Sequence, residues 1–164
     1  MSACRTLGGV HQVGHDRAHD TTTRTDTGTP PMAIDPRIVT ISKHLLRKAE
    51  QFFHLAEIGR DFADEPDGVD DAVVTLWVHA GIAASDVICC ARLGKHAQGE
   101  DHKDAVTLLG SVDPATAKHL SVLLGLKTRS GYTDTPTSTE SKRAERAAEA
   151  LIEAARRAPA QAGN

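Results

Sequence analysis

Residues 72–94 are almost wholly apolar, but three of their polar side chains are spaced so that they would share one face of a helix. At 100° per residue, Thr75, His79 and Asp86 fall within about 40° of one another and form a narrow polar stripe on a helix. A histidine held near a carboxylate could serve as an oriented general base. His79 and Asp86 are about 10 Å apart along the helix axis, however, so they cannot bond directly. A satisfied polar network in the core or at a dimer seam is the alternative interpretation.

A second group of such residues surrounds the loop that follows this segment. His96 and His102, with Glu100 and Asp101 between them, have side chains that can bind a metal, but histidines among loop charges more often belong to a solvated segment. We therefore expect neither a metal site nor a cofactor. Arg92 complements the dipole at the end of its helix and could also hold a phosphate. The histidines of this loop, together with His79 and Asp86, are the weak candidates for catalysis.

A third group lies further along the chain, where Lys127, Arg129 and Tyr132 flank a serine and a glycine. Two cations beside a tyrosine can contact the phosphates and a base of RNA or of a nucleotide. The alternative is that the cations complement a helix dipole and the tyrosine packs on the fold. With Arg92, these three residues form the candidate nucleotide- or RNA-binding set.

The composition of the chain limits what these groups can do. Its 164 residues suit one domain with a sizeable core, and an aromatic content of only 3% with abundant Ala and Leu favours helices over strands. The net charge of -3 provides no global basic field for nucleic acid, so any RNA contact must be local. Cys4, Cys89 and Cys90 form no CxxC spacing, which fits a reducing cytoplasm. We also expect no membrane span and no signal peptide.

The chain divides into a tail, a helical domain and a short end. Residues 1–31 are rich in Thr, Gly, His and Asp and predict a disordered tail, and Met32 is a plausible true start. Residues 32–160 predict one helical bundle, and residues 161–164 a frayed C-terminus.

Apolar periodicity and capping residues predict four main helices and one short helix in an up-and-down bundle. The first helix should carry a core stripe of Ile41, Leu45, Ala49, Phe52 and Ala56. The second should lie at the centre of the bundle, because it is apolar almost all the way round. The five expected helices span 35–64, 69–93, 101–110, 114–129 and 137–157.

The chain from about residue 35 to residue 157 resembles the HEPN domains (higher eukaryotes and prokaryotes nucleotide-binding), in particular an uncharacterised actinobacterial-type branch. The resemblance implies an all-α bundle that is commonly dimeric, with members that are RNases or toxins and others that are inactive partners binding nucleotides, RNA or a nucleotidyltransferase. The segments that carry it are HLLRKAEQFFHLAE, VTLWVHAGIAASDVICCARLG, GEDHKDAVTLL, LKTRSGYTDTPTS and RAERAAEALIEAARR.

Active members of that family carry an Arg, four to six residues and then a His, often with a Tyr two residues further on. When Tyr132 is matched to that tyrosine, Ser130 stands in the place of the histidine and Gly125 in the place of the arginine. Arg47 and His54 have the formal spacing, but they lie in the first expected helix.

The leading hypothesis is therefore a non-catalytic HEPN-like module that binds RNA or a nucleotide, or a protein partner such as a nucleotidyltransferase or an antitoxin, in a toxin–antitoxin or defence context. We expect a homodimer formed through apolar faces of the second helix and a neighbour. The enzymatic alternative is a metal-independent ribonuclease with a degenerate or rearranged site that uses His79, His96 or His102. A third possibility is a structural partner without a ligand.

Overall fold

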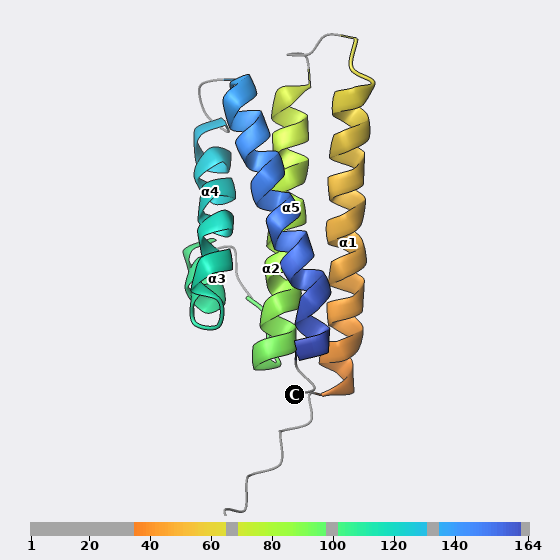
Figure 1. Ribbon diagram of the computed structural model, residues 1–164, viewed down its shortest axis with the longest axis vertical. Helices are drawn as coiled ribbons and strands as arrows, with labels where there is room; N and C mark the ends of the chain where they lie inside the picture. The colour runs from red at the N-terminus through yellow and green to blue at the C-terminus, as the bar shows by residue number, and fades with distance from the viewer. Residues whose placement is uncertain (1–34, 65–68, 98–101, 131–134, 162–164) are drawn as a thin grey trace, which may run out of the picture. The chain divides into compact units, whose positions relative to one another are not determined.

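The computed structural model describes residues 35–64, 69–97, 102–130 and 135–161. These residues fold into helices α1 (Pro36–Asp61), α2 (Asp70–Leu93), α3 (His102–Gly110), α4 (Pro114–Ser130) and α5 (Ser138–Gln161), and they contain no strand (Figure 1). The predicted all-α bundle of four long helices and one short helix is confirmed. The tail predicted for residues 1–31 and the start suggested at Met32 lie outside the described residues.

Capping residues stand at the start of α1 and at the end of α2. Asp35 accepts a hydrogen bond from the backbone N–H of Arg37 at 2.8 Å, and Pro36 takes the first helical position. Gly94 ends α2 in a left-handed conformation with φ of 64°, and its N–H donates to the carbonyl of Cys90. A residue with a side chain would be strained there, so the glycine stops the helix.

Side chains also cap the first turns of α4 and α5. Asp113 accepts the backbone N–H of Thr116 at 3.0 Å, one turn into α4. Thr137 and Glu140 form a reciprocal capping box at the start of α5, in which each side chain accepts the other residue's backbone N–H. Local hydrogen bonds from capping residues thus satisfy backbone groups at these helix ends.

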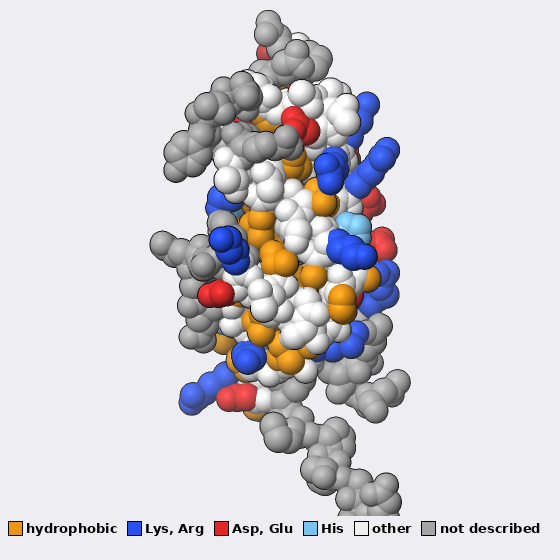
Figure 2. Space-filling model, turned by 90° about the vertical axis from the view of Figure 1, so that its left-hand side faces the viewer, with side chains coloured by type: hydrophobic (Ala, Val, Ile, Leu, Met, Phe, Trp, Pro, Cys, Tyr) orange, Lys and Arg blue, Asp and Glu red, His pale blue; other side chains and the backbone are white. Residues whose placement is uncertain are grey.

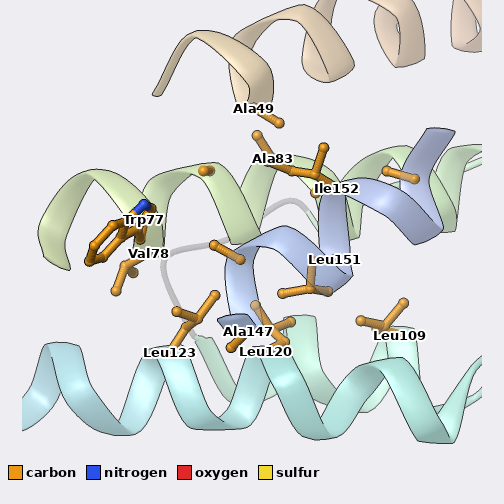
Figure 3. Packing of buried hydrophobic residues seen from close by; sticks show 14 of the residues in the cluster. Ala49, Trp77, Val78, Ala83, Leu109, Leu120, Leu123, Ala147, Leu151 and Ile152 are labelled. Carbon is orange, nitrogen blue, oxygen red and sulfur yellow. The ribbon is translucent and has the colours of Figure 1, made fainter. Parts of the chain in front are cut away.

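Helix α2 is the centre of the bundle and contacts each of the other four helices. It is the one described helix long and apolar enough to cross a membrane by length and composition, but 72% of its most apolar window is buried inside the bundle, as in the core helix of a folded domain. Its Val78 lies near Leu123 of α4, and Leu151 of α5 packs beside Leu120 (Figure 3).

The core line of α1 differs from the predicted stripe. Ser42, Ala49 and Ala56 are its buried residues, spaced seven apart, whereas Ile41 is 38% exposed and Phe52 is only partly buried. Small side chains on the inner line allow the α1 backbone to approach α2 closely, and the larger residues are displaced to the flanks. The prediction is confirmed for Ala49 and Ala56 and is wrong for Ile41, because it ranked positions by hydrophobicity rather than by the space available.

A glycine leaves room for two leucines where α2, α4 and α5 meet. A Cβ atom added at Gly81 of α2 would lie 2.2 Å from Leu123 of α4 and 3.1 Å from Leu151 of α5, and both leucines are fully buried. Gly125 of α4, by contrast, has no heavy atom within 4 Å of the same added position.

We expect Gly81→Ala to lower the free energy of unfolding by about 1–3 kcal/mol, because the methyl group overpacks the core. Gly125→Ala is the matched control and is expected to raise it by about 0.5–1 kcal/mol through helix propensity alone. Urea unfolding of both variants measures the difference. Equal stabilisation by both substitutions would contradict the close packing at Gly81.

Candidate functional site

The predicted polar stripe of α2 forms the outward ridge of that helix. Thr75 and His79 are exposed, and Asp86 is half-buried. The His79 ring lies 5.5 Å from the ring of Phe52 on α1, at an interplanar angle of 37°. The stripe is therefore neither a buried catalytic pair nor a network in the core of the bundle.

Asp86 is the ridge residue whose pKa is shifted by its surroundings. Burial raises its pKa, while the nearby charges of His96 and Lys48 and the backbone N–H of Ala97 act in the opposite direction. That N–H approaches the Asp86 carboxylate at 3.4 Å, and Nδ1 of His96 lies 3.0 Å from the Ala97 carbonyl, to which it donates. The loop after α2 thus folds back and brings His96 to Asp86, two residues that the sequence placed in separate groups.

The ridge has no activated nucleophile among the described residues. Burial raises the pKa of the Cys89 thiol to about 12 and that of Cys90 to about 11, and the Asp86 carboxylate adds to both shifts. A thiol with such a pKa stays protonated near neutral pH and does not attack. Ser85 donates its hydroxyl to the Ile82 carbonyl on its own helix, at 2.7 Å. Asp86 and His96 therefore act here as a polar link between α1, α2 and the loop.

The structure does not bring Arg92 to the other members of the predicted phosphate site. Arg92 lies beside Asp113 at the start of α4. Burial acts to raise the pKa of the Asp113 carboxyl, but hydrogen bonds from Thr116 and then the charge of Arg92 lower it overall. Lys127 lies on α4, 14 residues after Asp113. At 1.5 Å per residue it is roughly 20 Å from the end of the helix where Arg92 lies. The side chains of Arg129 and Tyr132 lie outside the described part of the chain.

The remaining histidine of the predicted loop group opens α3. The backbone of His102 is described but its side chain is not, and Glu100 and Asp101 are also outside the described ranges. Within those ranges, no three His, Cys, Asp or Glu side chains come close enough together to hold a metal ion.

The structure instead shows a hollow between α4 and α5 that the sequence did not predict, and we name it the basic groove. Its volume is about 420 Å³, and Figure 2 shows lysine and arginine side chains gathered beside a histidine on this side of the bundle. The lining residues are His119, Val122, Thr139, Lys142, Arg143, Arg146 and Ala147.

A second hollow of about 330 Å³ continues the basic groove toward the end of α4. Val122 and Arg143 line both hollows, and the extension adds Ser121, Gly125 and Leu126. Because Gly125 has no side chain, this part of the groove stays open. The two hollows together form an elongated surface with cations along the α5 side and aliphatic groups at its floor.

Among the described residues, the cations of the groove differ from the others on α5 in having no carboxylate partner. Arg156 donates to Glu50 of α1 at 2.9 Å, and Arg157 to Glu153 at 3.2 Å. Arg143 and Arg146 form no such ion pair among the described residues. Two unpaired guanidinium groups beside an apolar floor are a ready site for an anion with an apolar part.

Sequence reasoning missed this groove because its components come from two helices. The run Lys142-Arg143 with Arg146 one turn later was visible, but Glu140, Glu145 and Glu149 alternate with it and suggest a solvated charged helix. In the structure Glu145 is drawn away to an ion pair with Arg60 of α1. The signal was the i, i+1, i+4 spacing of the cations, which places them within about 100° on one face.

The chain matches no family model, no curated protein and no solved structure to which it was compared.

The electrostatics of Asp86 generate a testable pH dependence. Because its pKa is raised on folding, the stability that this group contributes is fully present below the unfolded pKa and is lost as pH rises through the folded pKa. Asp86→Asn keeps an oxygen for the Ala97 N–H and removes the charge. We expect this variant to have a Tm a few degrees above that of the parent chain near pH 7, and little advantage near pH 4.

Thermal unfolding across this pH range provides the measurement. Asp104→Asn, on the exposed face of α3, controls for the loss of one negative charge. A Tm difference for Asp86→Asn that is the same near pH 4 as near pH 7 would show that folding does not perturb the Asp86 carboxyl.

Proposed function

We propose that this protein is a non-catalytic helical module that binds RNA in the basic groove. The observation that carries the proposal is the convergence of Lys142, Arg143 and Arg146 with His119 over an apolar floor. The cations supply charge-assisted hydrogen bonds to phosphate oxygens, and the aliphatic floor can accept a ribose or the edge of a base.

The chemistry of the groove favours recognition of the backbone over recognition of sequence. His119 is its one ring-bearing lining residue, so it offers little surface on which bases could stack. The chain carries a net charge of -3, so attraction acts only close to the groove. Both features imply modest, salt-sensitive binding of a single strand. A free nucleotide shares the phosphate chemistry but reaches fewer of the cations.

The resemblance to HEPN domains agrees with this proposal, because that family includes inactive members that bind RNA or nucleotides. Ser130 and Gly125 stand where an active member has its histidine and arginine, which supports a binding role. The same resemblance suggests a cytoplasmic toxin–antitoxin or defence context in which a nucleotidyltransferase or an antitoxin is the protein partner. That context is part of the proposal.

Removal of two groove cations is expected to weaken RNA binding and to change its salt dependence. For a single strand, log K falls with log salt by about 0.7 per phosphate contact, so Arg143→Ala/Arg146→Ala should flatten that slope by roughly 1.4 and lower the affinity at least tenfold at low salt. Fluorescence anisotropy of a labelled oligouridine at several salt concentrations measures both quantities.

Arg156→Ala/Arg157→Ala removes the same charge from the far end of α5 and is the matched control. We expect it to leave the slope unchanged. A parent chain that does not bind oligouridine, or equal losses in the two double variants, would contradict binding in the groove. Lys127→Glu in the same assay tests the binding set suggested by the sequence.

The ribonuclease alternative has one supporting observation, which is that His119 lines the groove together with Arg143 and Arg146. These residue types can deprotonate a ribose hydroxyl and stabilise the charge that develops on the phosphate. Cleavage also needs an acid for the leaving oxygen, and the groove offers one imidazole. His79 lies on the α2 ridge and His96 in the loop that follows α2, and neither lines the groove.

We therefore expect the purified chain to leave RNA intact in EDTA, and His119→Ala to bind RNA within about threefold of the parent chain. Gel analysis of an end-labelled RNA after prolonged incubation checks the first expectation. Metal-independent cleavage that disappears in His119→Ala would replace the binding-module proposal with a nuclease. Cleavage that persists in His119→Ala but disappears in His79→Ala/His96→Ala would place the chemistry on the ridge instead.

A further inference from the structure

Exposed apolar side chains of this chain concentrate on one helix. Among the described residues six large hydrophobic side chains are exposed; α1 or the residue that caps it carries five of them, and the sixth is Leu93 of α2. Phe62 is 81% exposed and Leu55 is 53% exposed. The five are Val39, Ile41, Leu55, Ile58 and Phe62.

Four of these five share the side of α1 that faces away from the bundle. At 100° per residue, Ile41, Leu55, Ile58 and Phe62 fall within about 100° of one another, whereas the buried line of Ser42, Ala49 and Ala56 lies on the opposite side. We name this surface the α1 outer face. Burial against α2 and α5 is already supplied by the inner line, so the outer face is available to a partner.

The charges of α1 are divided between its two halves. Residues 36–48 contain Arg37, Lys43, Arg47 and Lys48 and no acidic residue. Residues 49–61 contain Glu50, Glu57 and Asp61, with Arg60 as the one lysine or arginine. Asp61 accepts from Arg60 of its own chain at 3.2 Å, an exposed pair that contributes little and that a partner's lysine can join. Such a helix is complementary to an antiparallel copy of itself, because each basic half then lies along an acidic half.

The positions of individual charges agree with this pairing. Lys43 and Asp61 are 18 residues apart, so at 100° per residue they fall on the same edge of the α1 outer face, on either side of Phe52. In two antiparallel helices related by a two-fold axis, equivalent edges face each other. With the axis near Gln51 and Phe52, Lys43 of one protomer lies opposite the partner's Asp61.

We infer that the α1 outer face binds a second copy of this chain, antiparallel and about a two-fold axis near Gln51. Phe62 and Ile58 of one protomer then cover Ile41 and the aliphatic stem of Arg47 of the other. The sequence alone predicts this contact on the second helix. Four helices cover most of α2, however, and its outer ridge presents Thr75, His79 and Asp86. The inference does not depend on RNA binding.

The oligomeric state of the full chain is the first test. Analytical ultracentrifugation should show a dimer, and Leu55→Glu/Phe62→Glu should raise its dissociation constant at least tenfold. Both residues are more than half exposed, so these substitutions should leave the fold intact, which circular dichroism verifies. Leu93→Glu is the matched control and should remain dimeric. A monomeric parent chain would overturn the inference, because the outer face would then be bare or covered by the chain's own N-terminal residues.

Two further variants test the antiparallel arrangement. Lys43→Glu and Asp61→Lys should each weaken the dimer about two- to fivefold, and their combination should restore it. In a Cys4→Ser background, Gln51→Cys should form an interchain disulfide across the axis, while Lys118→Cys on α4 should not. Cys89 and Cys90 are buried and should stay reduced. A dimer that neither cross-links at position 51 nor recovers in the charge swap would overturn this pairing.

Discussion

The whole structure depends on one constraint, which is that α2 must be covered on nearly every side. Its buried residues face all directions except the outward ridge of Thr75, His79 and Asp86, so one neighbouring helix could not remove them from water. Helices α1, α4 and α5 supply the cover, and α3 adds to it near the end of α2. This demand for cover also buries Trp77 completely, and its indole N–H finds no acceptor among the described residues. Such a group costs about 1–3 kcal/mol, which the burial of the large ring offsets.

The side chains that pack against α2 have to be small, because three helices must approach α2 together. Ala49 and Ala56 on α1 and Ala144, Ala148 and Ala155 on α5 are fully buried, and Gly81 on α2 itself leaves room for two leucines. Alanine faces bury little area per residue but bring backbones close enough for dispersion contacts along whole helices. The same choice leaves the larger apolar residues of α1 outside. The exposed side chains of the α1 outer face thus follow from the way in which the core is packed.

Sequence patterns contained most of the fold and little of the site. Caps such as Asp35, Gly94 and the Thr137–Glu140 box are local, so they could be predicted from neighbouring residues, as could the α5 stripe through Ala148 and Leu151. The inner line of α1 could not, because the choice between Ile41 and Ser42 depends on the width of the gap to α2. The approach of His96 to Asp86 and the meeting of His119 with Arg143 depend on a loop path and on a helix pairing. Residue spacing along the chain predicts neither the loop path nor the helix pairing.

The net charge of this protein does not show how its charged side chains are distributed. The value of -3 suggests an acidic surface of no particular character, yet two of the acidic residues form ion pairs between helices. Glu145 pairs with Arg60, and Glu50 pairs with Arg156, so both acids link α1 to α5. Among the described residues, Arg143 and Arg146 line the groove without an ion pair to a carboxylate. Exposed pairs of this kind contribute little to stability, so their main effect is to determine which cations remain available to bind something else.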